Sequence, residues 1–171
     1  YSSEKGSLVI YDTSDINSIT ALGSVAIANS QSVVVLGDYA YVAAGNGGGN
    51  QFVTVDVSNP TSPSVVSSIT VTNGVYDVFV HSSGNYIYTH NNYQGFTIDI
   101  TTPSAPVSLG LLPGTQTTST NGWAYDPVGD ILYQTGSFGG NIRYGAWDVS
   151  NPLSPTTLVT TNLYASAAPV T

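Results

Sequence analysis

One short motif occurs four times along the chain and limits its fold more than any other feature. Each copy alternates apolar residues with others, ends in an aspartate and continues into a turn. The motif aspartates are Asp12, Asp56, Asp99 and Asp148. The turn reads DVSNPTSP from Asp56, DVSNPLSP from Asp148 and DITTPSAP from Asp99, and it is less regular, DTSDINSI, from Asp12. A period of about 45 residues predicts one structural unit built four times.

A second motif keeps the same period and predicts a strand. A glycine and a polar residue precede alternating positions at 37–41, 84–88 and 129–133, which is typical of a half-buried strand. Two more strands complete each unit, one before this motif and one after the aspartate turn. We expect them at 33–35, 78–80 and 123–125, and at 21–27, 65–71, 107–112 and 157–163. No segment combines helical periodicity with capping residues, so helix should be nearly absent.

Units of four short strands at this period are the blades of a β-propeller. The predicted fold is all-β, a propeller segment with about three complete four-stranded blades and partial blades at both ends. A β-sandwich has strands of similar length, but it gives no reason for one turn sequence to return at every fourth strand. With strands A to D running from axis to rim, we expect the following division. Residues 1–28 hold the end of strand B and strands C and D, residues 29–72, 73–114 and 115–164 are blades, and residues 165–171 begin another strand A.

The two ends of the chain are expected to fall inside one blade cycle. By the repeat, Tyr1 aligns with Tyr88 at the end of a strand B, and Pro169 aligns with Asp77 in strand A. We therefore expect that the chain does not close into a ring by itself. Either it is a segment of a longer propeller, or partner chains supply the missing strands.

The repeated motifs resemble those of a known family. The [LF]-x-[IV]-x-D core, the D-[VI]-S-N-P-x-x-P turn and the G-[DN]-Y-x-Y strand are similar to the LVIVD-repeat β-propellers, over nearly the whole chain. Around Asp12 the likeness is weaker, because Ile16 and Ile19 replace the two prolines. YVTN-type surface propellers are more distantly similar. The resemblance implies a secreted or surface protein of bacteria or archaea, with a complete ring of about six to eight blades, and it carries no active-site motif.

Charge and composition exclude several classes of partner. Lys5 and Arg143 are the only strong cations against ten acidic residues, for a net charge of −8. Nucleic acid and anionic membrane surfaces both need a basic patch, so neither is an expected partner. No apolar run is long enough for membrane insertion. The chain has neither Cys nor Met, which excludes disulfides and thiolate metal sites. Together with a neutral polar surface, this favours an extracellular or cell-surface location.

The four motif aspartates are interpreted as structural. A carboxylate before a Ser-Asn-Pro turn can accept hydrogen bonds from the amides of that turn. Four equivalent positions on four blades also lie too far apart to form one site. Acidic residues gather at 12–15 and 126–130, where calcium is the alternative to ordinary turn acids. Neither segment matches an established calcium loop, so no metal site is predicted.

Asp77 is the strongest candidate for a ligand-binding residue. It lies in strand A, which can line the central channel of a propeller. His81 in the following turn and Trp123 in the next blade are the other candidates. For His81 and for His90, at the end of strand B, the alternative is an exposed histidine without a function. For Trp123 and the other aromatic residues, the alternative is packing between blades.

No catalytic residue and no cofactor are predicted. The chain has no G-x-S-x-G elbow. Asp77 lacks an indicated partner for glycoside hydrolysis. The glycine-rich segment 45–50 lacks the lysine and the helix of a phosphate loop, so it is expected to be a flexible hairpin.

Three classes of function stay open at this point. The first is a non-catalytic surface scaffold or binding module that engages a protein or a glycan, and it is our leading hypothesis. The second is a structural subunit that assembles with further copies of itself into a filament or surface layer, because unpaired strand edges recruit other strands. The third is a hydrolase or lyase that uses the central channel.

Overall fold

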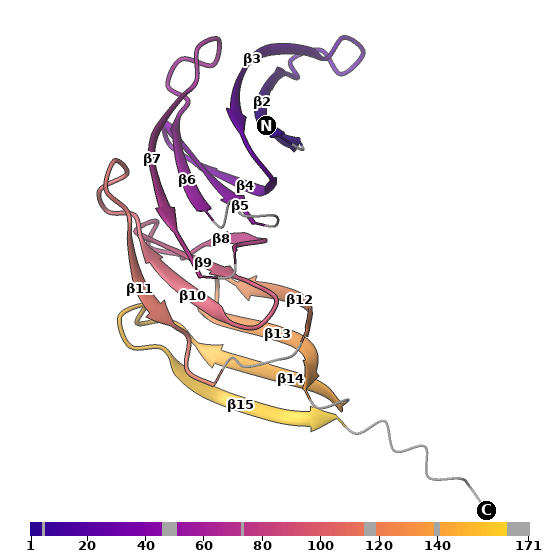
Figure 1. Ribbon diagram of the computed structural model, residues 1–171, viewed down its shortest axis with the longest axis vertical. Coiled ribbons are helices and arrows are strands. Elements are labelled where there is room, and N and C mark those ends of the chain that lie inside the picture. The colour runs from indigo at the N-terminus through magenta and orange to yellow at the C-terminus, as the bar shows by residue number, and fades with distance from the viewer. Residues whose placement is uncertain (5, 46–50, 73, 115–118, 139–140, 164–171) are drawn as a thin grey trace, which may run out of the picture.

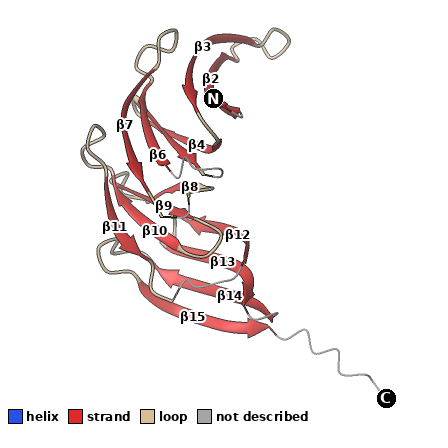
Figure 2. Cartoon of the chain, viewed as in Figure 1, coloured by secondary structure: helices blue, strands red, loops and turns tan. Residues whose placement is uncertain are grey.

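The computed structural model is built of strands alone. It describes residues 1–4, 6–45, 51–72, 74–114, 119–138 and 141–163, and these contain fifteen strands and no helix. All strand pairs are antiparallel, and they form one three-stranded and three four-stranded sheets (Figure 2). The prediction of an all-β fold with almost no helix is confirmed. The expected strand at 165–171 and most of the hairpin expected at 45–50 lie outside the described residues.

Each sheet is a simple up-and-down run of strands, and we call the four sheets blades 1 to 4 in chain order. Blade 1 contains β1 (Ser2–Glu4), β2 (Gly6–Asp12) and β3 (Thr20–Ile27). Blade 2 contains β4 (Ser30–Leu36), β5 (Tyr39–Ala44), β6 (Gln51–Asp56) and β7 (Ser64–Thr70). Blade 3 contains β8 (Val78–Val80), β9 (Tyr86–His90), β10 (Gly95–Asp99) and β11 (Val107–Leu111). Blade 4 contains β12 (Ser119–Asp126), β13 (Ile131–Phe138), β14 (Asn141–Asp148) and β15 (Thr156–Leu163).

The four blades follow one another around an open arc. Blade 1 lies at one end of the arc and blade 4 at the other, and the sheets do not close into a ring (Figure 1). This is the outcome expected from the sequence. Each blade therefore packs face to face against its neighbours in the chain, at three junctions. We call the face of a blade that meets the next blade its leading face, and the opposite one its trailing face.

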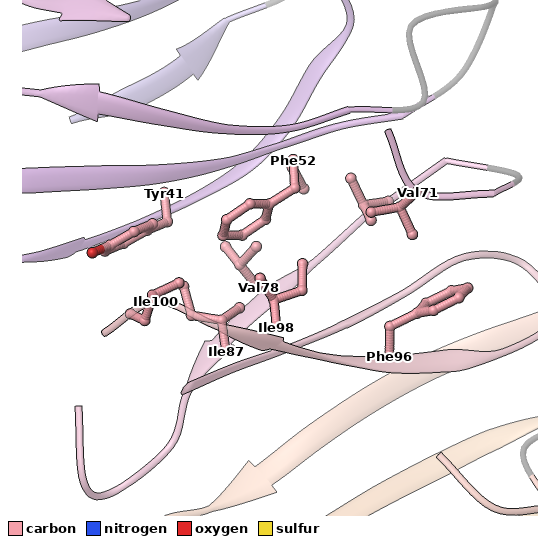
Figure 3. Close-up of a cluster of buried hydrophobic side chains, with 10 residues drawn as sticks. Tyr41, Phe52, Val71, Val78, Ile87, Phe96, Ile98 and Ile100 are labelled. Atoms are coloured by element: carbon pink, nitrogen blue, oxygen red, sulfur yellow. The ribbon is translucent and has the colours of Figure 1, made fainter. Parts of the chain in front are cut away.

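The hydrophobic core is divided among the three junctions. Because side chains alternate across a strand, blades 2 and 3 contribute to two junctions each, whereas blades 1 and 4 contribute to one each. The first junction is aliphatic and includes Leu8, Ile10 and Ile27 of blade 1 and Ala40, Val42, Val53 and Val55 of blade 2. The second adds rings, with Tyr41 and Phe52 of blade 2 against Val78, Ile87, Phe96 and Ile98 of blade 3 (Figure 3). Each fully buried large side chain stabilises the fold by about 1.5–3 kcal/mol.

The third junction, between blades 3 and 4, differs in its chemistry. Its buried cluster consists of Tyr88, Leu112, Leu132, Trp147 and Val149, with Phe79, Trp123 and Tyr125 packed against it. Both tryptophans of the chain therefore lie at this one junction. Both histidines also lie beside it, in blade 3. The third junction is thus the part of the described chain where aromatic and ionisable side chains meet.

Candidate functional site

Two aspartate–histidine pairs lie at opposite ends of the third junction. Asp77 precedes β8, and His90 ends β9, which runs antiparallel to β8. His81 follows β8 at its other end and contacts Asp130 of blade 4. We call Tyr76, Asp77, His90 and Trp123 the Asp77 cluster, and His81, Tyr125 and Asp130 the Asp130 cluster.

In the Asp77 cluster, both nitrogens of the His90 ring are engaged. Nε2 lies 3.1 Å from Oδ2 of Asp77, and Nδ1 lies 3.0 Å from the carbonyl oxygen of Asn91. The carboxylate of Asp77 and the carbonyl oxygen of Asn91 therefore hold the ring at two points. The hydrogen bond from His90 lowers the pKa of Asp77, and its effect exceeds the opposing effect of burial.

Aromatic rings stack on the His90 side chain. The ring centroid of Tyr76 lies 6.2 Å from that of His90, and the ring centroid of Trp123 lies 5.2 Å from it. Trp123 in turn stacks on Trp147 at 5.7 Å. This group of four rings crosses the junction, and His90 is only 5% exposed.

Two glycines make room for the tryptophan rings. A Cβ atom on Gly95 would lie 2.5 Å from Cη2 of Trp123, and one on Gly145 would lie 2.2 Å from Cη2 of Trp147. No other residue fits at these positions without displacing a ring. The indole of Trp147 is also fixed by its Nε1, which donates to the carbonyl oxygen of Pro113 at 2.6 Å.

The Asp77 carboxylate is the accessible part of its cluster. Its side chain is 51% exposed, whereas the histidine behind it is buried. The backbone at this point is fixed, because the hydroxyl of Thr89 donates to the carbonyl oxygen of Asp77 at 2.6 Å. Nearby, Asn92 donates from Nδ2 to the hydroxyl of Tyr76 at 3.2 Å, and Tyr93 is 45% exposed. The cluster thus presents a fixed carboxylate to solvent beside aromatic and amide groups.

The Asp130 cluster is a hydrogen-bonded link between blades 3 and 4. Tyr125 donates from its hydroxyl to Oδ1 of Asp130 at 2.5 Å and accepts from the amide of Ser82 at 2.9 Å. His81 accepts at Nδ1 from the amide of Ser83 at 3.1 Å, and its Nε2 lies 3.5 Å from Oδ1 of Asp130. Burial, followed by the bond to Asp130, raises the pKa of Tyr125 to about 12. The bond from Tyr125 lowers the pKa of Asp130.

The motif aspartates have the geometry of Asx turns. In each case Oδ1 accepts the amide of the residue two positions on, at 2.9 Å. The amide donors are Ser14, Ser58, Thr101 and Ser150. Hydrogen bonds from the serines lower the pKa of Asp12, Asp56 and Asp148. Within the described residues, no group of three or more His, Asp or Glu side chains could hold a metal ion.

Of the three candidates from sequence, the structure brings Asp77 and Trp123 into contact with His90, and it places His81 in the other cluster. The alternative that both histidines are exposed is wrong, because each is only 5% exposed. Sequence analysis gave His90 no role beside Asp77. The predicted antiparallel pairing of strands A and B could have indicated this contact. It places the start of β8, beside Asp77, opposite the end of β9, at His90.

The sequence also matches a family of repeats. The profile of the LVIVD repeat matches residues 28–71 and 76–111, which cover blades 2 and 3. Together the two segments span 80 of the 171 residues, and over them the chain is similar to the LVIVD repeat. The irregular turn of blade 1 and the wider spacing before blade 4 lie outside the two matched segments. No curated protein matches the sequence.

Solved structures with the same fold are longer than this chain. A functionally unknown protein from Desulfotomaculum acetoxidans has a TM-score of 0.72 at 14% identity, over 95% of this chain and 52% of that one. A candidate 6-phosphogluconolactonase from Bacteroides fragilis has a TM-score of 0.71 at 10% identity, over 92% and 52%. The β-propeller domain of Cps50 (Swd1) from Myceliophteria thermophila has a TM-score of 0.58 at 12% identity, over 77% of this chain and 42% of that one. These identities show the fold alone, and the chain spans about half the length of such structures or less. No described helix is long and apolar enough to cross a membrane.

Proposed function

We propose that this chain is part of a non-catalytic β-propeller binding module whose ligand meets the Asp77 cluster. The observation that carries the proposal is the half-exposed carboxylate of Asp77, which the buried His90 contacts through Nε2. A histidine that acts as a general base directs one ring nitrogen at the reacting group. Both nitrogens of His90 are engaged by Asp77 and Asn91, so its role is to position Asp77.

The ligand class we propose is a glycan without phosphate groups. The Asp77 carboxylate can accept hydrogen bonds from sugar hydroxyls, and Tyr93, which is 45% exposed, lies in the segment that follows His90. A phosphorylated ligand would instead call for cationic side chains. The chain has only two Lys and Arg residues in all and a net charge of −8. The acidic surface therefore favours a neutral partner.

We also place this binding module outside the cytoplasm, on the cell surface or secreted. Support comes from the composition, since 7% of residues are charged and Cys and Met are absent. Such a surface relies on Ser, Thr, Asn and Gly for its polarity. Peptide antibodies against the chain, applied to fractionated cells of its source, would test the location. Recovery in the cytoplasmic fraction alone would contradict it.

A glycan array followed by calorimetry with the strongest neutral oligosaccharide tests the binding function. We expect Asp77→Asn to weaken that binding by at least about tenfold, because a charged acceptor becomes a neutral one. The matched control is Asp38→Asn, an exposed aspartate in a turn of blade 2. Equal affinity of the Asp77 variant and the wild-type chain would show that the site is wrong. Failure to bind any glycan would reject the ligand class.

An enzymatic assay addresses the competing function. The substrate is 6-phosphogluconolactone, because a structural neighbour carries that activity in its name. We expect no turnover above the uncatalysed rate, given the engaged nitrogens of His90 and the scarcity of cations. Hydrolysis that is lost in Asp77→Asn or His90→Gln would replace the binding proposal with a catalytic one.

A further inference from the structure

The leading face of blade 4 has the residues of a blade junction but no blade against it among the described residues. Tyr41, Tyr88 and Tyr133 occupy the same place in the repeat, the last position of the G-[DN]-x-x-Y motif. Tyr41 is 2% exposed and Tyr88 is fully buried, each covered by the following blade. Tyr133 is only half-buried. A further blade would cover it in the same way.

Other residues of this face are apolar, and several of them are exposed. Cross-strand pairing places Ala124, Tyr133, Ala146 and Val159 side by side on one face. Val159 is 40% exposed, and Ile142, two positions from Tyr144 on the same face, is 49% exposed. A hollow of about 220 Å³ lies among Gly122, Trp123, Ala124, Tyr133, Gln134 and Thr135. Exposed apolar surface of this kind typically marks an interaction site.

The first two junctions show how the next blade reaches such a face. At each of them, the aspartate turn of the next blade packs on the last strand of the preceding blade. A Cβ atom on Gly23 of β3 would lie 2.5 Å from the carbonyl oxygen of Pro60 and 3.0 Å from Cδ of Pro63, both in the turn of blade 2. Ser67 of β7 donates to the carbonyl oxygen of Pro103, in the turn of blade 3, at 3.1 Å. The residue on the outer strand is small in both cases. At the equivalent Gly110 of blade 3, a Cβ atom would have no described atom within 4 Å, so the third junction does not share this contact.

The two terminal blades depart from this pattern in a matching way. At the position of Gly23 and Ser67, blade 4 has the larger and apolar Val159. At the positions of Pro60 and Pro63, blade 1 has Ile16 and Ile19. Both isoleucines are exposed, by 76% and 50%, because no described blade precedes blade 1. Apolar residues thus occur on both of the terminal faces that no described blade covers.

We propose that the leading face of blade 4 docks on the trailing face of blade 1 in a second copy of this chain. In this head-to-tail contact, Ile16 and Ile19 of one copy pack on Val159 of the other, as Pro60 and Pro63 approach Gly23 within the chain. The contact joins two different faces, so it closes a ring of copies if the rotation allows and otherwise extends as a filament. The chain covers 52% of two similar structures, so two copies have the length of one such fold.

Electrostatics sets a condition for the association. Each copy carries a net charge of −8, so two copies repel one another at long range. Salt screens that repulsion and leaves apolar contact almost unaffected. Head-to-tail assembly should therefore strengthen as ionic strength rises.

Sedimentation velocity of the full chain over a wide concentration range tests the proposal. We expect dimers or larger head-to-tail species, with Val159→Asp and Ile16→Asp each weakening association by at least about tenfold. Val159→Lys should weaken it as well, and combining Val159→Lys with Ile16→Asp should restore it, because every contact then joins opposite charges. The matched control is Val128→Asp, in a turn of blade 4 where the side chain is 94% exposed.

Two outcomes would overturn the proposal. One is a wild-type chain that stays monomeric at all concentrations. The other is association that Val159→Asp and Ile16→Asp leave unchanged while circular dichroism shows an intact fold. Neither result bears on the Asp77 cluster, because that cluster lies at a different junction and its ligand test does not depend on assembly.

Discussion

The first and third blade junctions use one backbone geometry for two kinds of interface. The buried cluster at the first junction contains only aliphatic side chains from Leu, Ile, Ala and Val. The third joins its blades through stacked rings, the contact of His81 with Asp130 and hydrogen bonds of tyrosine hydroxyl groups. Aliphatic packing tolerates many exchanges of similar volume, whereas ring stacks and buried polar groups depend on direction. The repeated backbone therefore allows different kinds of side chain at the junctions between blades.

The largest expected effect is the loss of stability when a buried ring is removed from the third junction, compared with removal of an aliphatic side chain from the first. Trp147→Ala should destabilise the fold by about 3–5 kcal/mol, since it removes a fully buried ring. Ile10→Ala at the first junction should cost about 2–5 kcal/mol by the same mechanism. Urea unfolding of both variants measures the difference. A smaller loss for Trp147→Ala than for Ile10→Ala would show that the aromatic junction is not the tighter one.

A glycine exchange tests whether the tryptophan stack depends on space. Gly95→Ala should cost about 1–3 kcal/mol, because the new methyl group meets the Trp123 ring and Leu112. In a Trp123→Ala background the same exchange should cost much less. This double-mutant cycle, measured by chemical unfolding, gives the coupling between the two positions. Additive effects would contradict direct contact as the cause.

Two tyrosines at equivalent positions of the repeat allow the contribution of a hydrogen bond to stability to be distinguished from that of burial. Tyr88 donates from its hydroxyl to the carbonyl oxygen of Val149 across the third junction, at 2.9 Å. Tyr41, at the second junction, is equally buried but is packed by Phe52 and other apolar side chains. Tyr88→Phe should cost about 1 kcal/mol or somewhat more, and Tyr41→Phe close to nothing. Equal losses in thermal or urea unfolding would remove this distinction.

The smallest effect concerns acid. The pKa of Asp77 lies below its ordinary value of 3.8, so its ionised form stabilises the fold above that pH. The stabilisation is lost as pH falls through the lowered value. Tryptophan fluorescence reports on the third junction alone, because both tryptophans lie there. On acidification we expect the tryptophan fluorescence to change at a higher pH than the far-ultraviolet circular dichroism does. Asp77→Asn should reduce this early change in fluorescence. Coincident transitions in the wild-type chain would contradict it.

Much of the fold was predictable from sequence because its determinants are local. The strand at 107–112 ends one residue early, at Leu111, and that at 157–163 begins one residue early, at Thr156. Alternation of side chains and the turn residues between them depend only on near neighbours. The Asx turn at Asp56 is equally local, since the carboxylate and the amide of Ser58 are two residues apart.

The burial of the histidines was not predictable in this way. His90 ends a strand, where exposure is the ordinary expectation. The rings of Tyr76 and, from the next blade, Trp123 stack on its side chain. The Trp123 ring fits because Gly95 has no side chain. Nothing in the local sequence around His90 indicates either partner.

By itself the sequence determined the repeating unit, the strands and the turns of this chain. Each of these follows from hydrogen bonds and side-chain alternation within a few residues. Only the tertiary structure decided that Asp77, His90 and Trp123 meet, that His81 belongs to a separate cluster, and that Val159 is left uncovered. The physical reason is that these relations cross a blade junction, where the volume and direction of side chains on two sheets set which groups touch.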